Sequence, residues 1–382
     1  MTGLGAATAP ENVRALAGEV SVRALETEAA RSVPRDLVRK IGATGAFHLF
    51  VPSSLGGRSV DPMTGCAIVE ELSRADGSTG WTSMILNTTF FTCWLEPDVA
   101  RAMLQTDPVL GMAGLFSPVG KTEPVGSDGA VRVTGRYPFN SGSPHATWFC
   151  EGAMVSADGG QPEWRFLFLP SADVEILDTW RVAGLRGTAS HDVAIHGAVV
   201  PREYTANPVF EKAKHDEPHF RWSFFALLAS LISGFPLGVA RRSLDEFVAL
   251  AEKRGRGAGE PLASEQVVQL EVARCEGQLR AARSSLFESL SSAWDTAVAG
   301  DNIDRSQRVA IRLAGSNAMR TAIDVVDTMF RLAGGKAIYD DSPLQRCWRD
   351  LHAGSSHIFF SNNHLSHIGR ILMGQPADDW LM

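Results

Sequence analysis

Residues that could carry chemistry gather near the end of the chain, between Gln345 and His364. A Gly334-Gly335 break and a Ser342-Pro343 start signal precede them, since Pro is tolerated at the first position of a helix. At about 100° per residue, one face of such a helix carries ionisable and small side chains together: Asp350, Gly354, His357, Ser361 and His364. A flat ligand could approach the backbone of this face closely, beside an acid or base. The alternative is a core helix in which a neighbour satisfies His357.

Composition and charge exclude several classes of function. Hydrophobic residues make up 45% and charged residues 21% of the 382, as in ordinary soluble proteins. The net charge of −7 and the isoelectric point near 5.8, with no run of basic residues, argue against a nucleic-acid partner. The N-terminal residues lack the basic and apolar pattern of a signal peptide, so we expect no export.

The cysteines and histidines predict no metal site. The five cysteines form no CxxC pair, and such a scattered, odd set indicates reduced thiols in a cytoplasmic protein: Cys66, Cys93, Cys150, Cys275 and Cys347. His352 and His357 are five residues apart, which turns their rings about 140° from each other on a helix. This spacing does not suit two ligands of one ion.

One segment has nearly the length of a membrane span. Residues 222–240 hold no charged residue over 19 positions. Serines, Gly234 and Pro236 interrupt the segment, and a strongly charged amphipathic helix follows directly. We therefore expect no membrane insertion, and predict a helix that is buried on all sides in a bundle or an oligomer core.

Hydrophobic periodicity divides the chain into three parts. In the first hundred residues, apolar side chains recur at helical spacing over 11–31, 34–42, 62–76 and 78–95. The next hundred residues contain short β-rich runs with no long helical pattern between them: Val131/Val133, 148–155, 164–169, 174–177 and 193–200. Four long helical segments with short connections complete the chain: 220–253, 264–299, 304–332 and 343–373.

These patterns predict an α+β fold in three domains. We expect an N-terminal α-helical domain over residues 1–106, a middle antiparallel β-domain over 107–212 and a C-terminal four-helix bundle over 213–382. No GxGxxG follows a predicted strand and no Walker A motif is present, so the usual nucleotide-binding loops, including one for NADH, are absent.

This order of domains resembles the acyl-CoA dehydrogenase fold, and several motifs support the likeness. Gly334-Gly335 and Ser342-Pro343-Leu344-Gln345-Arg346 resemble the junction between its third and fourth bundle helices, and Phe139-Asn140-Ser141-Gly142 resembles its flavin-contacting strand end. Three motifs resemble, more closely, the two-component flavin-dependent monooxygenases (group D) built on this fold: Gly77-Ser78-Thr79-Gly80-Trp81, Gly184-Leu185-Arg186-Gly187-Thr188 and Arg349-Asp350-Leu351-His352-Ala353-Gly354. The resemblance covers residues 11–373.

The resemblance implies the oxygenase component of a two-component monooxygenase. A separate flavin reductase would supply reduced flavin, as FADH2, with FMN as the alternative. O2 would add to flavin C4a, and the resulting C4a-hydroperoxyflavin would hydroxylate an aromatic small molecule, phenolic or indolic, in a pocket that excludes water. Relatives on this fold pack apolar helices against other subunits, so segment 222–240 also predicts a homotetramer.

Two other functions remain open: an acyl-CoA dehydrogenase-type flavin oxidoreductase and a non-catalytic helical scaffold. A dehydrogenase needs a carboxylate base to remove the α-proton of its thioester. The resemblance places that base late in the bundle or just before its first helix. However, the last glutamate of this chain is Glu288, and residues 220–234 hold no Asp or Glu. Gly354 to His357 lie where the base is expected, which favours the monooxygenase.

A further motif resembles the flavin loop of the dehydrogenases but lies too close to Ser141. The stretch from Thr122 to Asp128 matches TEPxxGSD, yet only 12 residues separate Asp128 from Ser141. Asp128-Gly129 is more simply a hairpin turn that enters a strand. We therefore predict that Phe116-Ser117-Pro118 is the counterpart of the flavin loop.

The resemblance also implies roles for single residues. Ser141 would hydrogen-bond flavin N5 or O4, and His357 would polarise or deprotonate the substrate or keep the peroxide protonated. The expected flavin contacts are Trp81, Phe116, Ser117, Ser141, Arg186, Thr188 and Ser190, with Arg254 and Arg256 at the pyrophosphate of a neighbouring subunit. Ordinary alternatives exist for all of them, such as a turn residue for Ser141, a core aromatic for Trp81 and a solvated basic loop for residues 254–256.

Overall fold

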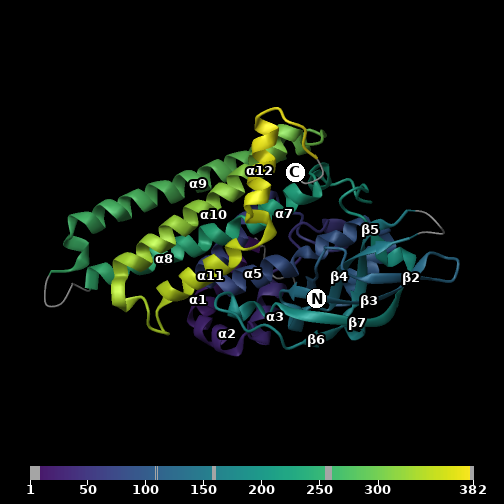
Figure 1. The fold of residues 1–382 in the computed structure, drawn as a ribbon, viewed down its shortest axis with the longest axis horizontal. Helices are drawn as coiled ribbons and strands as arrows, with labels where there is room; N and C mark the ends of the chain where they lie inside the picture. The colour runs from purple at the N-terminus through teal and green to yellow at the C-terminus, as the bar shows by residue number, and fades with distance from the viewer. Residues whose placement is uncertain (1–8, 108, 110, 157–160, 254–259, 379–382) are drawn as a thin grey trace, which may run out of the picture.

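The order of helices, strands and helices confirms the predicted α+β fold. The computed structural model describes residues 9–378 apart from 108, 110, 157–160 and 254–259 (Figure 1). The long helices α8, α9 and α10 run side by side on one side of the molecule, and most strands lie on the other. One continuous hydrophobic core extends through the helical, β and bundle parts. The domain boundaries at 106/107 and 212/213 stay a prediction.

The N-terminal part is helical, with two interruptions that periodicity did not reveal. Its helices are α1 (Ala9–Val22), α2 (Ala24–Ala30), α3 (Arg35–Ala43), α4 (Pro62–Ala75), α5 (Gly77–Leu86) and α6 (Pro97–Gln105). The predicted helix over 11–31 breaks at Arg23, and the one over 78–95 is α5 followed by the 3-10 helix Thr88–Trp94. Asp61 and Asp76 cap α4 and α5, because each carboxylate accepts a backbone N–H three residues later.

Two four-stranded sheets form the middle part. Their strands are β1 (Met112–Ala113), β2 (Lys121–Val125), β3 (Ala130–Asn140), β4 (Trp148–Val155), β5 (Glu163–Pro170), β6 (Glu175–Leu177), β7 (His191–Val200) and β8 (Thr205–Ala206). The strand orders are β1-β4-β5-β8 and β2-β3-β7-β6, antiparallel except for β1 with β4. The hairpin predicted at Asp128-Gly129 is confirmed by the pairing of Lys121 with Thr134 and Val125 with Ala130. Two-residue strands such as β1 and β8 are too short to leave a pattern in the sequence.

The C-terminal part is a helical bundle, but two of its four predicted segments are broken. Its helices are α7 (Phe224–Ile232), α8 (Gly234–Lys253), α9 (Gln266–Val298), α10 (Arg305–Ala333), α11 (Pro343–Ser355) and α12 (Asn362–Leu372). Segment 220–253 breaks at Ser233. Segment 343–373 breaks at Ser356–Ser361, where His357 caps a short 3-10 helix over Ile358–Phe360. Capping side chains offer the backbone an alternative to the continuing helix, which periodicity does not register.

The apolar segment that resembled a membrane span lies inside the fold. The stretch Phe224–Lys253 passes the length and hydropathy test for a span, yet 89% of its most apolar window is buried within the protein. This burial agrees with the predicted bundle helix. It also removes the reason given for a homotetramer, because contacts within one chain already cover the segment.

Candidate active site

Four of the predicted site residues form one chain of hydrogen bonds. Trp81 on α5 donates its Nε1–H to Ser141 Oγ at 3.1 Å. Ser141 Oγ lies 2.7 Å from Ser190 Oγ, and Ser190 Oγ lies 2.6 Å from Thr188 Oγ1. Thr188 Oγ1 donates to the carbonyl of Leu185 at 2.8 Å. All four side chains are buried.

The two ends of this hydrogen-bonded chain determine which group donates and which accepts in each of its hydrogen bonds. The indole N–H of Trp81 can only donate and the carbonyl of Leu185 can only accept. Because Thr188 donates to that carbonyl, Ser190 must donate to Thr188 and Ser141 must donate to Ser190. The Ser141 oxygen accepts one hydrogen bond from Trp81 and keeps a second lone pair. Ser141 is therefore prepared to accept a hydrogen bond from an N–H group of a ligand.

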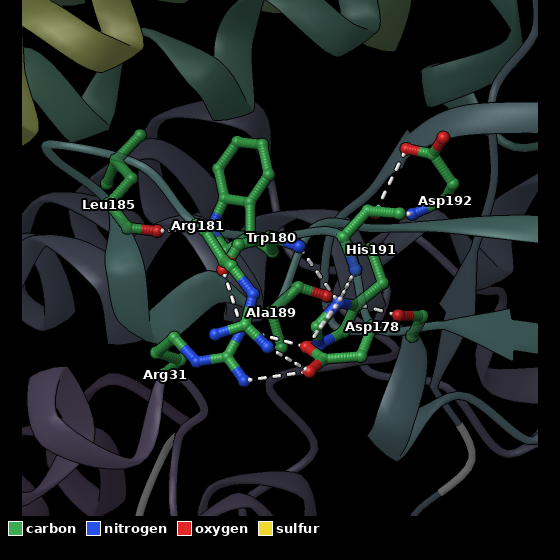
Figure 2. Close-up of polar contacts among 10 residues, drawn as sticks. Arg31, Asp178, Trp180, Arg181, Leu185, Ala189, His191 and Asp192 are labelled. Atoms are coloured by element: carbon green, nitrogen blue, oxygen red, sulfur yellow. Dashed lines mark hydrogen bonds and ion pairs between the residues drawn. The ribbon is translucent and has the colours of Figure 1, made fainter.

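The loop between β6 and β7 carries Thr188 and Ser190, and side chains from several elements hold it (Figure 2). Asp178 accepts hydrogen bonds from Arg31 at 2.8 Å and from Arg181 at 2.6 Å. Trp180 donates its Nε1–H to the carbonyl of Leu185 at 2.9 Å. His191 accepts the backbone N–H groups of residues 179 and 180 on Nδ1, each at 3.2 Å. Contacts with Arg31 at the end of α2, with His191 at the start of β7 and within the loop itself thus fix the conformation of the β6–β7 loop.

Asp350 connects this loop to the bundle. Leu185 and Ala189 have φ angles of 53° and 45°, which residues with a side chain seldom adopt. Asp350 Oδ1 on α11 accepts the Leu185 N–H at 2.6 Å and so helps to hold that conformation. The carboxyl of Asp350 is 2% exposed. Burial, and then the charge of Asp76, raises the pKa of Asp350 to about 7, against the smaller opposing effects of the Leu185 hydrogen bond and of Arg346.

Replacement of Asp350 by Asn is expected to change how stability depends on pH. Between about pH 4 and 7 the folded protein keeps a proton on Asp350 that the unfolded chain releases, so this group makes the wild type less stable as pH rises. Asn cannot titrate but can still accept the Leu185 N–H. Thermal unfolding at pH 4.5 and 7.5 measures the difference in free energy of unfolding between the variant and the wild type. This difference should shift in favour of the variant by at least about 1 kcal/mol from pH 4.5 to pH 7.5, which corresponds to roughly one pKa unit. An equal difference at both pH values would contradict this assignment.

His357 lies beside Trp81, but not on the predicted helix face. Helix α11 ends at Ser355, so Asp350 and Gly354 share it, while His357, Ser361 and His364 do not. This part of the prediction was wrong because the chain turns after α11. The His357 ring nevertheless lies 5.5 Å from the Trp81 ring at an interplanar angle of 75°.

The hydrogen bonds of His357 assign its proton. Nδ1 accepts the backbone N–H of Phe359 at 3.3 Å. Burial, together with the charge of Arg312 and the neighbouring His364, lowers the pKa of His357 to about 4. The ring is therefore neutral at pH 7, and its single proton is on Nε2. His357 presents a hydrogen-bond donor rather than a vacant base.

Gly354 lets α11 approach Trp81 closely. A Cβ atom at this position would lie 2.5 Å from Cε1 of Phe235 and 3.2 Å from Cζ3 of Trp81. Trp81 also packs edge-on against Phe235, with ring centroids 5.0 Å apart. Trp81 is thus held between α11 and α8 while it donates to Ser141.

The surroundings of Ser141 fit a flavin. Arg186, next to the hydroxyl chain, has a buried Nε with no hydrogen-bond partner among the described residues. Phe139, two residues before Ser141, has a φ of 62° and is 64% exposed, and its ring meets Trp180 edge-on at 6.3 Å. A flavin has a flat ring with polar edges and a phosphate. The Phe139 ring could pack against the flat ring, and the Arg186 Nε–H and the free lone pair of Ser141 could hydrogen-bond the polar groups. Within the described residues, no group of three or more His, Cys, Asp and Glu side chains could hold a metal ion.

The structure does not bring all predicted flavin contacts together. Phe116 packs in an aromatic cluster with Phe91, Phe166 and Phe224, and Ser117 is exposed on the loop before β2. No hydrogen bond or ring contact joins either residue to Ser141 in the described part of the chain. Arg254 and Arg256 lie outside the described residues.

Sequence reasoning gave no role to two buried ionisable residues, Asp350 and Arg312. Asp350 was placed on the correct helix face but given no role. Arg312 on α10 was not singled out, although it lies three residues after Val309 and seven before Met319, on the buried stripe of that helix. A charge at an apolar-stripe position was the signal that could have found it.

Comparisons with known proteins identify the family of the chain. Two acyl-CoA dehydrogenase family models match, the N-terminal domain over residues 8–95 and the C-terminal domain over 230–362. An indole-3-acetate monooxygenase of Pseudomonas putida is 31% identical over 93% of this chain and 91% of its own. The oxygenase component of an FADH2-dependent resorcinol hydroxylase of Rhizobium sp. (strain MTP-10005) is 26% identical over 92% of this chain and 90% of its own. The crystal structure of the 3-HSA hydroxylase of Rhodococcus sp. RHA1 is 27% identical, with a TM-score of 0.92 over 99% of both chains. The chain belongs to the two-component flavin-dependent monooxygenases of the acyl-CoA dehydrogenase fold.

Proposed function

We propose that this chain takes reduced flavin from a separate reductase and, with O2, hydroxylates a small aromatic molecule of the indole or phenol class. The observation that carries the proposal is the hydroxyl of Ser141, held by Trp81, with the donor His357 against the same indole ring. The names of the relatives, which include indole-3-acetate and resorcinol enzymes, support the substrate class. Neither Asp nor Glu follows α11 before residue 378, so the base of a thioester dehydrogenase has no candidate there.

The chain's own residues would bind and orient the flavin, which supplies the activated oxygen when it is bound. Ser141 would accept the N5–H that distinguishes reduced from oxidised flavin, because its own proton is committed to Ser190. Arg186 would bind the polar edge or the phosphates of the flavin with its unpartnered Nε–H. Thr188 and Ser190 keep Ser141 in its orientation and do not need to touch the flavin themselves.

His357 would act on oxygen as a hydrogen-bond donor. With Nδ1 occupied by the Phe359 N–H, only Nε2–H is available to a substrate or peroxide oxygen. A donor there stabilises an oxygen that gains negative charge during hydroxylation. The rings of Trp81 and Phe359 pack against His357, and Phe235 packs against Trp81, so this side of the site is apolar.

The proposal includes an assembly and a compartment. A homotetramer, with Arg254 and Arg256 near a neighbouring subunit's pyrophosphate, rests on the family likeness alone. All five cysteines are free and buried, which supports a reducing compartment such as the cytoplasm. Light scattering at micromolar concentration tests the assembly, and a monomer would remove the role of both arginines.

Incubation with reduced FAD tests the function. We expect that protein, chemically reduced FAD and an indole or phenol, mixed with 18O-labelled O2, give a product that contains one labelled oxygen, and that hydrogen peroxide falls by the same amount. Anaerobic addition of acyl-CoA thioesters to the protein with oxidised FAD should not bleach the flavin. Peroxide as the sole product across a panel of indoles and phenols, or rapid bleaching by a thioester, would refute the proposal.

A further inference from the structure

Arg312 on α10 is a buried arginine without a counter-charge. The residue is 3% exposed, and its guanidinium carbon lies 4.2 Å from the centre of the Phe359 ring. Its one hydrogen bond to a described residue is from Nη2 to Nδ1 of His364, at 2.9 Å. The Nε–H and Nη1–H groups have no partner among the described residues. Four of its five N–H donors are thus available to a group outside the described residues.

The partner of Arg312 cannot neutralise it. Burial lowers the pKa of the Arg312 guanidinium to about 10, with no carboxylate contribution, so it stays charged at pH 7. Burial and the charge of Arg312 lower the pKa of His364 to about 4, so that ring is neutral. By contrast, Arg283 also lies over a phenyl ring, that of Phe287, but it pairs with Glu70 at 2.8 Å. A buried charge that lacks a partner is unfavourable, and chains that retain one commonly use it on a ligand.

Arg312 is connected to the candidate active site through two rings. Phe359, which Arg312 covers, stacks on His357 at 5.5 Å and 21°. His357 in turn meets Trp81. The charge of Arg312 also helps to keep His357 neutral. Two residues after Phe359, the hydroxyl of Ser361 is buried and has no hydrogen-bond partner in the described part of the chain. The end of the site near Phe359 therefore has a cation, Arg312, and an unused hydroxyl, Ser361. The side chains proposed to bind flavin lie at the other end, around Ser141.

We propose that Arg312 binds the carboxylate of the substrate, and that the substrate is an aromatic carboxylate whose ring lies beside His357 and Trp81. The inference rests on the proposed monooxygenase function and narrows its substrate class. Charge-assisted hydrogen bonds from Arg312 would orient the ring, and the carboxylate would supply the missing counter-charge. Neutral indoles and phenols of the same shape leave the guanidinium unpaired and should bind less well.

Binding of a matched pair of ligands tests this assignment without flavin. Indole-3-acetate and indole-3-acetamide have nearly the same shape but differ in charge, as do 4-hydroxyphenylacetate and its amide. Calorimetry on the full-length protein should show that the acid of at least one pair binds about 10–100-fold more tightly than its amide, the usual strength of hydrogen bonds to charged groups. Arg312→Met should reduce the preference to about 1 and leave the affinity for the amide unchanged. Arg283→Met, the control with a paired arginine, should keep the wild-type preference.

Several outcomes would overturn the assignment. One is that the wild type binds acid and amide equally in both pairs. Another is that Arg312→Met still prefers the acid to the amide. Met in place of an unpaired buried charge should be neutral or stabilising, and Arg312→Gln provides a second uncharged variant. Failure of both variants to fold would mean that Arg312 is structural. Because binding is measured without flavin, an acid preference without any product formation would refute the monooxygenase proposal alone.

Discussion

Product formation should fall about 10²–10³-fold when His357 is replaced by Ala, the usual range for the loss of one hydrogen-bond donor to an oxygen that gains negative charge in the transition state. Flavin affinity should remain near that of the wild type, because His357 meets Trp81 only through a ring contact, and its side-chain hydrogen bond is to the Phe359 N–H rather than to the chain at Ser141. Reduced flavin would still be consumed, with its electrons diverted to hydrogen peroxide. The loss of the Nδ1 cap on Phe359 N–H should cost about 1 kcal/mol of stability. The product-to-peroxide ratio and the melting temperature, taken on one preparation, measure both effects.

Two control variants separate the donor role from a structural one. His357→Gln keeps an amide N–H that can donate, so it should recover part of the lost coupling. His352→Ala removes a half-exposed histidine of α11 that pairs with Asp327 and should leave coupling unchanged. Because the pKa of His357 is about 4, activity between pH 5.5 and 8 should show no inflection from this group. A His357→Ala protein that is less stable but equally coupled would show that the ring is structural.

Replacement of Gly354 by Ala should lower both stability and product formation. The new methyl group would lie 2.5 Å from the Phe235 ring, which is closer than such carbon atoms approach, and 3.2 Å from the Trp81 ring, which is a tight contact. Overpacking of this kind costs typically about 1–3 kcal/mol. Because Trp81 donates to Ser141, displacement of its ring also disturbs the orientation of that hydroxyl. Melting temperature and the product-to-peroxide ratio should both decrease.

Gly277 is the matched control for this change. Gly277 also lies within a helix, α9, but a Cβ atom there would meet no atom within 4 Å. Gly277→Ala should therefore raise stability by about 0.4–1 kcal/mol, since Ala restricts the unfolded chain, and leave coupling unchanged. If the two variants behaved alike, close packing of Gly354 against Trp81 would not be the reason for its glycine.

The sequence determined the order of the parts and the local punctuation of the chain. Ser342-Pro343 started α11, Asp61-Pro62 started α4, and Asp128-Gly129 formed the hairpin, because caps and turns depend on neighbours along the chain. The motifs at Trp81, Ser141 and Thr188 were also sufficient to predict one flavin site. Their hydrogen bonds confirm that these three residues lie together, although their contact with flavin stays a prediction.

Only the tertiary structure decided which charges are buried and which lack a partner. Asp350 and Arg312 read as ordinary helix residues in the sequence, and the elements packed around them give Asp350 its raised pKa and leave Arg312 unpaired. The tautomer of His357 depends on a turn that helical periodicity did not predict. The apolar segment 222–240 shows the same limit, since its composition could not distinguish burial within one chain from burial between subunits. Periodicity reports which side of an element avoids water, whereas pKa values and unsatisfied donors depend on atoms that are distant in the sequence.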